Sequence, residues 1–114
     1  MLVVDDYRGI TNALCRHIRV LGHDARGVYT GRDGLAEAAA WQPDLVLVDL
    51  LLPDLTGYEV AKKLRTYERP MYLASISTRS GIDNSFFDTH VQKPFGLTHL
   101  SALISQMTTR PQSS

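Results

Sequence analysis

The feature that most constrains the fold is the segment LVLVDLLLPD at residues 45–54, in which a run of seven aliphatic residues is interrupted by one acid, Asp49. Consecutive aliphatic positions are typical of a strand that is covered on both faces, as in a parallel sheet. An ionised side chain inside such a strand is costly unless it has a partner. We therefore expect Asp49 to lie at the end of a buried strand rather than in its middle.

Short apolar segments alternate with amphipathic segments along the rest of the chain. Strands are predicted at residues 1–4, 24–29, 45–50, 71–76 and 90–92, and helices at residues 8–21, 35–41, 58–67 and 97–107. Strands that alternate with helices favour right-handed crossovers and a parallel sheet with helices on both faces. The predicted fold class is α/β, with a doubly wound five-stranded sheet.

Length and charge limit the classes of protein to consider. A chain of 114 residues allows one domain, which we place at residues 1–109, followed by a polar tail at residues 110–114. Twelve Lys and Arg residues balance twelve Asp and Glu residues, so no basic excess favours direct binding to nucleic acid or to a membrane. No apolar run approaches the roughly 20 residues of a membrane helix. We expect a cytoplasmic protein.

Two predicted strands deliver acids to the same edge of the sheet. Asp5 and Asp6 follow the first strand, and Asp49 ends the third. Open parallel sheets bind their ligands at this edge. Two carboxylates about 4 Å apart repel each other by on the order of 4 kcal/mol, so three of them need a cation. Hard oxygen ligands with open positions suit Mg²⁺, which often also binds a phosphate.

Two further side chains are expected at the same edge. Lys93 follows the fifth strand and would add a compact positive charge, and Ser75 or Ser77 near the end of the fourth strand would add a hydroxyl. A flavin- or nucleotide-binding enzyme with this type of sheet would need an amide-rich phosphate loop. The first turn, DDYRG, is acidic, and the pattern GxxxxGK[ST] does not occur, so we set that class aside.

Three motifs taken together resemble the receiver domain of two-component response regulators: VVDD at residues 3–6, LVLVDLLLPDLTG at 45–57 and HVQKPF at 90–95. The resemblance covers nearly the whole chain and implies a CheY-like, flavodoxin-like fold with strand order 2-1-3-4-5. It implies a phosphoprotein whose donor is a histidine kinase or a histidine phosphotransfer protein, and it allows a homodimer. The segments VLGHDA and KPFGLTHL are similar to receivers fused to hybrid sensor kinases.

Carried over residue by residue, the resemblance implies a role for each residue of the site. Asp49 would accept the phosphoryl group. Asp5, Asp6, Asp49 and the backbone carbonyl of Leu51 would hold Mg²⁺, and Lys93 would contact the phosphoryl group. The domain would then catalyse its own phosphorylation and its own slow dephosphorylation, without turnover of an external substrate.

The resemblance also implies a switch, in which a hydroxyl near the end of the fourth strand moves toward the phosphoryl group. This hydroxyl would be coupled to the ring three positions before the lysine, here His90. Counting from Pro70 favours Ser75 as the hydroxyl, whereas the apolar pattern of the strand favours Ser77, which we prefer. Leu51 would flank the path of the hydrolytic water and hinder it, so we expect slow self-dephosphorylation.

One segment departs from the family pattern. Only fifteen residues separate Ser77 from Lys93, although a helix of about 11 residues, a strand of about 5 and two loops would ordinarily lie there. We therefore expect the fourth helix to be shortened or absent. This departure favours a competing hypothesis, a pseudo-receiver that binds proteins independently of phosphorylation. The complete set of three acids and one lysine opposes it.

Overall fold

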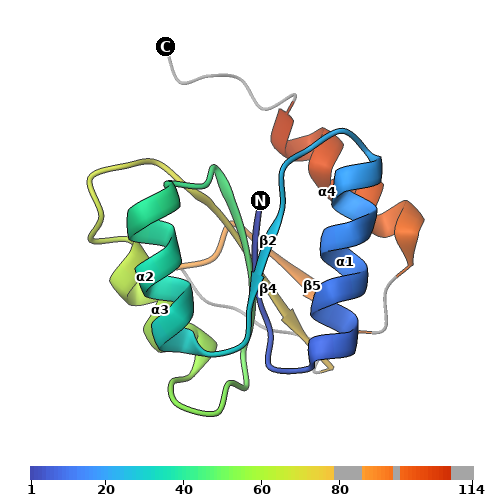
Figure 1. The fold of residues 1–114 in the computed structure, drawn as a ribbon. Coiled ribbons are helices and arrows are strands. Elements are labelled where there is room, and N and C mark those ends of the chain that lie inside the picture. The colour runs from blue at the N-terminus through green and yellow to red at the C-terminus, as the bar shows by residue number, and fades with distance from the viewer. Residues whose placement is uncertain (79–85, 94–95, 109–114) are drawn as a thin grey trace.

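The computed structural model describes residues 1–78, 86–93 and 96–108, which form a sheet between two layers of helices (Figure 1). The strands are β1 (Leu2–Val4), β2 (Arg26–Val28), β3 (Leu45–Asp49), β4 (Tyr72–Ser77) and β5 (Thr89–Gln92). The helices are α1 (Arg8–Val20), α2 (Gly31–Trp41), α3 (Gly57–Leu64) and α4 (Leu97–Thr108). Within the described residues, the strands and helices follow the predicted order.

The five strands are parallel and follow the order β2-β1-β3-β4-β5. This order confirms the predicted doubly wound, flavodoxin-like sheet. The winding reverses between β1 and β3, which lie side by side with Val4 opposite Val48. The residues that follow these two positions, Asp5 and Asp49, therefore emerge at the same edge of the sheet, where such folds bind their ligands.

Helices α1 and α4 cover one face of the sheet, and α2 and α3 cover the other (Figure 1). Strand β3 contributes to both cores because its side chains alternate between the faces. Leu45 and Leu47 belong to the cluster beneath α1 and α4, and Val46 and Val48 belong to the cluster beneath α2 and α3. The apolar run is therefore a strand packed on both faces, and Asp49 is its last residue.

Helix α2 begins at Gly31, four residues before the predicted start at Leu35. Thr30 is its N-cap, and the Thr30 side chain accepts a hydrogen bond from the backbone N–H of Asp33 at 3.1 Å. Two glycines in the first turn disfavour a helix by local propensity, which explains why the sequence pattern placed the start too late.

Helix α3 ends at Leu64, three residues before the predicted end at Tyr67. Just beyond it, the Arg65 guanidinium donates to the carbonyl of Met71 at 2.8 Å and to the Asp88 carboxylate at 2.9 Å. These bonds tie the end of α3 to the start of β4 and to the chain that enters β5.

The predicted shortening of a fourth helix falls on residues 79–85, which lie outside the described residues, as do 94–95 and the tail at 109–114. Where the description resumes, Phe86 and Phe87 pack against the cluster beneath α2 and α3. The ring of Phe87 meets that of Tyr58 edge-on, with 6.3 Å between centroids. Among the helices described, none is long and apolar enough to cross a membrane.

Candidate functional site

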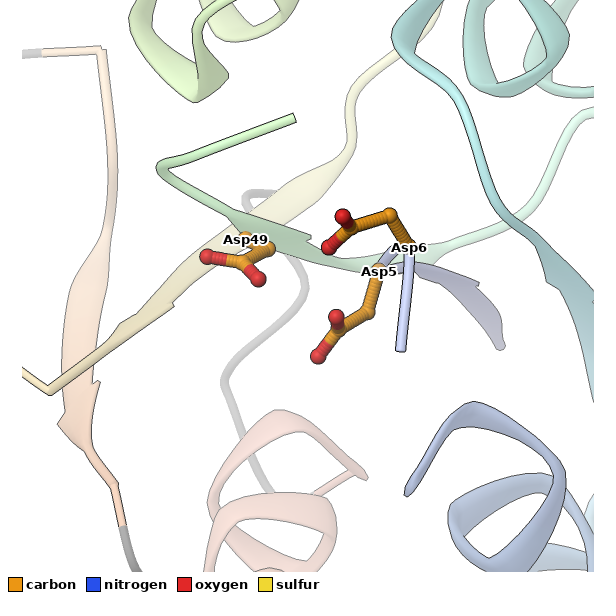
Figure 2. Close-up of side chains that lie close together, drawn as sticks. All are labelled: Asp5, Asp6 and Asp49. Atoms are coloured by element: carbon orange, nitrogen blue, oxygen red, sulfur yellow. The ribbon is translucent and has the colours of Figure 1, made fainter. Parts of the chain in front are cut away.

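Three carboxylates meet where β1 and β3 end. One oxygen atom from each of Asp5, Asp6 and Asp49 lies within 4.8 Å of the other two. Figure 2 shows the three side chains leaving neighbouring strand ends, with the Asp6 carboxylate directed toward Asp49. Asp5 is completely buried, Asp49 is 8% exposed, and Asp6 is exposed. The structure thus brings together the three acids that the sequence places at this edge.

Asp5 is fixed by the turn that leads from β1 into α1. Its backbone N–H donates to the carbonyl of Val28 in β2 at 3.1 Å, and its Oδ1 accepts from the backbone N–H of Tyr7 at 3.0 Å. The Asp5 carbonyl accepts a hydrogen bond from the Thr11 hydroxyl at 2.7 Å. Because the backbone and one carboxylate oxygen are both held, the second oxygen, Oδ2, has a defined position in the cluster.

Asp49 is held by the loop that follows β3. Its Oδ1 accepts from the backbone N–H of Leu51 at 3.1 Å, and the N–H of Gly57 donates to the Leu50 carbonyl at 2.9 Å. A Cβ atom at position 57 would lie 2.5 Å from the carbonyl oxygen of Asp49, so glycine is needed for α3 to start this close to the acid. The Leu51 side chain, beside Asp49, is 71% exposed.

Lys93 brings a positive charge into the cluster from the end of β5. Its Nζ lies 2.9 Å from Oδ2 of Asp5 and 3.2 Å from Oδ2 of Asp49. Burial lowers the pKa of Lys93, but the hydrogen bonds and charges of Asp5 and Asp49 outweigh burial and raise the pKa above its ordinary value. The ammonium group is therefore charged at neutral pH.

The acids are only partly neutralised by this lysine. Burial raises the pKa of Asp49 above its ordinary value, and the neighbouring Asp5 raises it further, although the Leu51 N–H and Lys93 act in the opposite direction. Three carboxylates and one ammonium leave about two negative charges in a small volume. A further cation would relieve this repulsion.

The donor set fits Mg²⁺. It consists of carboxylate oxygens from two adjacent residues and from a neighbouring strand, which are hard ligands of the kind that this ion prefers. Two of the three acids are largely buried and one is exposed, so part of any coordination sphere would remain for water and a phosphate oxygen.

Each of the two candidate switch serines is bonded to β5 or to the residue that follows it. Ser75 is completely buried, and its hydroxyl forms a hydrogen bond with Nδ1 of His90, the residue directly opposite in the β4–β5 register. Ser77 is 4% exposed, and its carbonyl accepts from the backbone N–H of Lys93 at 2.6 Å. The structure therefore couples His90 to Ser75, the alternative that the sequence pattern ranks second.

Sequence reasoning missed Asp54, which lies in the loop after β3. Its carboxylate accepts from the backbone N–H of Gly31 at 2.8 Å and from that of Arg32 at 2.9 Å, at the start of α2. The sequence marks Asp54 only as a turn residue after Pro53. The bonded residues are 23 and 22 positions apart in the sequence, and a single contact of this kind produces no periodic pattern of residues from which it could be predicted.

The sequence model of the response regulator receiver domain matches residues 1–105. The chain belongs to this family. This receiver domain is 35% identical over 118 residues to the sensor histidine kinase AtsR of Burkholderia thailandensis, covering 93% of this chain and 19% of AtsR. It is 35% identical over 107 residues to the transcriptional regulatory protein KdpE of Mycobacterium tuberculosis, covering 90% of this chain and 47% of KdpE.

Solved structures agree with the family. The receiver domain is similar to a CheY-like receiver domain from Methylobacillus flagellatus, with a TM-score of 0.85, 26% identity, and coverage of 93% of this chain and 95% of that one. It shares the fold of the response regulator TrrA of Thermotoga maritima, solved in complex with Mg²⁺-BeF, with a TM-score of 0.84, 24% identity, and coverage of 93% and 96%. The chain spans about half, or less, of the length of the curated relatives it matches.

Proposed function

We propose that this receiver domain accepts a phosphoryl group on Asp49 from a phosphohistidine of a histidine kinase or a histidine phosphotransfer protein, in a Mg²⁺-dependent reaction. The observation that carries the proposal is the position of Lys93 Nζ, 2.9 Å from Asp5 and 3.2 Å from Asp49 within a group of three acids. A structural ion pair needs one acid. A cluster of three acids, two of which contact one lysine, suits a site that is completed by a cation and an anion.

The reaction transfers the phosphoryl group from nitrogen to oxygen. A carboxylate oxygen of Asp49 forms a bond to phosphorus while the bond between phosphorus and the imidazole nitrogen of the donor breaks. The electron pair of that bond stays on the nitrogen, which takes up a proton. Negative charge spreads over the three remaining phosphoryl oxygens, and the Lys93 ammonium, 3.2 Å from Asp49, stabilises part of it.

Asp5, Asp6, Asp49 and the carbonyl of Leu51 are the residues that would hold Mg²⁺. When bound, the ion supplies positive charge that stabilises the phosphoryl oxygens in the transition state. Asp5 needs little rearrangement for this role, because the N–H of Tyr7 and the Lys93 ammonium already hold its two oxygens. Asp6 is exposed and can meet the ion from the solvent side.

The surface around the site supports a protein as the phosphoryl donor. Tyr7 is 65% exposed, Leu51 is 71% exposed, and Ile10 in the first turn of α1 is 37% exposed. Tyr7 follows the metal-binding acids directly, and Leu51 lies two residues after Asp49. Large apolar side chains exposed next to a reactive group are typical of a surface that a partner protein covers.

We also propose that a β4 hydroxyl binds the phosphoryl oxygens and so starts the conformational change. Ser77 is the hydroxyl that the sequence pattern favours, and its carbonyl is bonded to the backbone of Lys93. The hydrogen bond to His90 favours Ser75 instead. If Ser75 turns toward the phosphoryl group, it releases the His90 ring, and a local charge change becomes a change in the β4–β5 surface.

Intact-mass measurement tests the acceptor directly. The domain is incubated with Mg²⁺ and acetyl phosphate or phosphoramidate, and we expect the mass of one added phosphoryl group. The adduct should be absent from Asp49→Asn and from wild type in EDTA. Asp33→Asn, which removes an exposed acid of α2, is the matched control and should keep it.

Two outcomes would contradict the proposal. An adduct that persists in Asp49→Asn would show that another residue is the acceptor. A wild-type domain that forms no adduct with either small donor or with a histidine kinase would instead favour the phosphorylation-independent binding module.

A further inference from the structure

The N-terminus of α2 is capped by a residue from a distant loop. The backbone N–H of Gly31 donates to Oδ1 of Asp54 at 2.8 Å, and the N–H of Arg32 donates to Oδ2 at 2.9 Å. Asp54 belongs to the loop between β3 and α3, whereas α2 precedes β3 in the sequence. Each of its two carboxylate oxygens therefore bonds an amide of a helix that is not adjacent to this loop in the chain. The two bonds join residues that are 23 and 22 positions apart in the sequence.

Asp54 completes the hydrogen bonding of the first turn of α2. The first amides of any helix lack partners within the helix. Thr30 serves one of them, because its hydroxyl accepts from the Asp33 amide, while its carbonyl accepts the first helical bond, from the Gly34 amide. The amides of Gly31 and Arg32 remain, and Asp54 takes both. The hydrogen bond from the Arg32 N–H, and then that from the Gly31 N–H, lower the pKa of Asp54 below its ordinary value. The Asp54 carboxylate is therefore ionised at neutral pH, and its negative charge is favourable at the positive end of the helix dipole.

The loop that carries Asp54 also carries Leu51. The loop is closed at its base by the bond from the Gly57 N–H to the Leu50 carbonyl at 2.9 Å and by an antiparallel bridge between Leu51 and Thr56. Asp54 therefore lies at the tip of a small closed loop, with Leu51 on one side of it. Leu51 belongs to the base of this loop, three residues before Asp54, so the position of the tip bears on Leu51 through a short segment.

The same start of α2 is linked to the other metal-binding segment. The backbone N–H of Asp5 donates to the carbonyl of Val28, the last residue of β2, at 3.1 Å. Only Tyr29 and Thr30 separate Val28 from Gly31. A continuous series of bonds therefore runs from Asp5 through the end of β2 and the start of α2 to Asp54 and its loop.

We propose that Asp54 is a positioning residue for the metal site, which it serves by anchoring the loop of Leu51 to the start of α2. This inference rests on the proposed function, because it assumes that Asp5, Asp6, Asp49 and the Leu51 carbonyl bind Mg²⁺. Through Asp54, the distance between the Leu51 carbonyl and the Asp5 segment is set by the fold before the ion binds. Without Asp54, part of the binding free energy of Mg²⁺ is spent on ordering the loop.

Asp54→Ala, Asp54→Asn and Thr30→Ala separate positioning from stability. Thr30→Ala is the matched control, because it removes a cap from the same helix end without touching the loop. Mg²⁺ affinity is measured by calorimetry well below the melting temperature of each variant. We expect binding about tenfold weaker in Asp54→Ala, about threefold weaker in Asp54→Asn, which keeps one acceptor oxygen, and within about twofold of wild type in Thr30→Ala.

Amide hydrogen exchange in EDTA provides a readout without metal. Exchange across residues 50–57 should be faster in Asp54→Ala than in wild type and unchanged in Thr30→Ala. The inference is wrong if Asp54→Ala leaves both Mg²⁺ affinity and loop exchange as in wild type, or if Thr30→Ala changes both equally. A wild type that binds no Mg²⁺ overturns the proposed function and the metal part of this inference, while the exchange data still decide whether Asp54 anchors the loop.

Discussion

Ser75 and His90 form a side-chain hydrogen bond between directly paired residues of β4 and β5. Ser75 is completely buried, and a rotation of its hydroxyl toward a phosphoryl group on Asp49 would alter this bond to His90. We predict that phosphorylation shifts the NMR signals of the His90 ring in wild type and in Ser77→Ala, but not in Ser75→Ala. The opposite pattern, with the shift lost only in Ser77→Ala, would identify Ser77 as the switch hydroxyl.

We predict that Leu51→Asn shortens the lifetime of the phosphorylated domain. The Leu51 backbone N–H is bonded to Asp49, so its exposed side chain lies beside the proposed acceptor, where an apolar group hinders water and an amide can orient it. We expect a rate about tenfold higher, which corresponds to about 1.4 kcal/mol in the barrier. Phosphorus NMR follows the decay. Val20→Asn, at a 78% exposed residue of α1, is the control, and an unchanged lifetime in Leu51→Asn would contradict the prediction.

We predict that Asp49→Asn stabilises the metal-free domain. The raised pKa of Asp49, caused by burial and then by Asp5, means that the folded domain binds a proton more tightly than the unfolded chain does. The ionised carboxylate therefore opposes folding at neutral pH, and this effect disappears as the pH falls through the folded-state pKa. In EDTA at neutral pH we expect the melting temperature to rise by about 4 °C, or roughly 1 kcal/mol.

The difference in melting temperature between Asp49→Asn and wild type should shrink as the pH is lowered. Glu68→Gln, which neutralises an exposed acid outside the cluster, serves as the control and should change stability little at any pH. A difference that stays constant with pH would show that the substitution acts through packing and not through charge.

We predict that Asp6→Asn weakens Mg²⁺ binding with little effect on the metal-free fold, because Asp6 is exposed whereas Asp5 is buried. An ion at one hundred times its dissociation constant stabilises the folded state by about 2.7 kcal/mol. If Asp6→Asn lowers the affinity about tenfold, this stabilisation falls by about 1.3 kcal/mol at the same concentration. Thermal unfolding in EDTA measures the stability of the metal-free domain, and unfolding with Mg²⁺ measures the stabilisation that the ion adds. Equal Mg²⁺ stabilisation of wild type and Asp6→Asn would exclude Asp6 from the site.

We predict that Gly57→Ala destabilises the domain by about 2 kcal/mol, because the added methyl group would have to displace the Asp49 carbonyl, 2.5 Å away. Urea unfolding measures the loss. Gly96→Ala is the control, since nothing lies within 4 Å of a Cβ atom there. Equal stability of the two variants would show that α3 can shift without strain. We also expect slower phosphorylation of Gly57→Ala, because the displaced residue is Asp49, the proposed acceptor.

The parts of the fold and site that could be predicted depend on local patterns. The aliphatic run of β3 predicts a buried strand because each of its residues faces one of two cores. Parallel pairing then predicts that the acids that end β1 and β3 share an edge, as Asp5 and Asp49 do. Lys93 follows from the same rule, since β5 ends at that edge.

The parts that could not be predicted depend on register and on long-range contacts. Ser75 and Ser77 are two positions apart and so share a face of β4, and the choice between them as the partner of His90 requires the β4–β5 register. The contacts of Asp54 with the start of α2 lie across a loop and have no periodic signature. The early start of α2 was missed because Gly31 and Gly34 have low helix propensity, although Thr30 and Asp33 form a recognisable cap.

The bond between Lys93 and Asp5 spans 88 residues of sequence. During synthesis on the ribosome, Asp5, Asp6 and Asp49 leave the exit tunnel first, and the lysine that balances them emerges only when β5 does. A nascent chain that ends before β5 therefore carries the acids without their cation. Because the lysine that balances the acids follows the last strand of the sheet, the receiver domain can complete this charged cluster only after nearly the whole sheet has been translated.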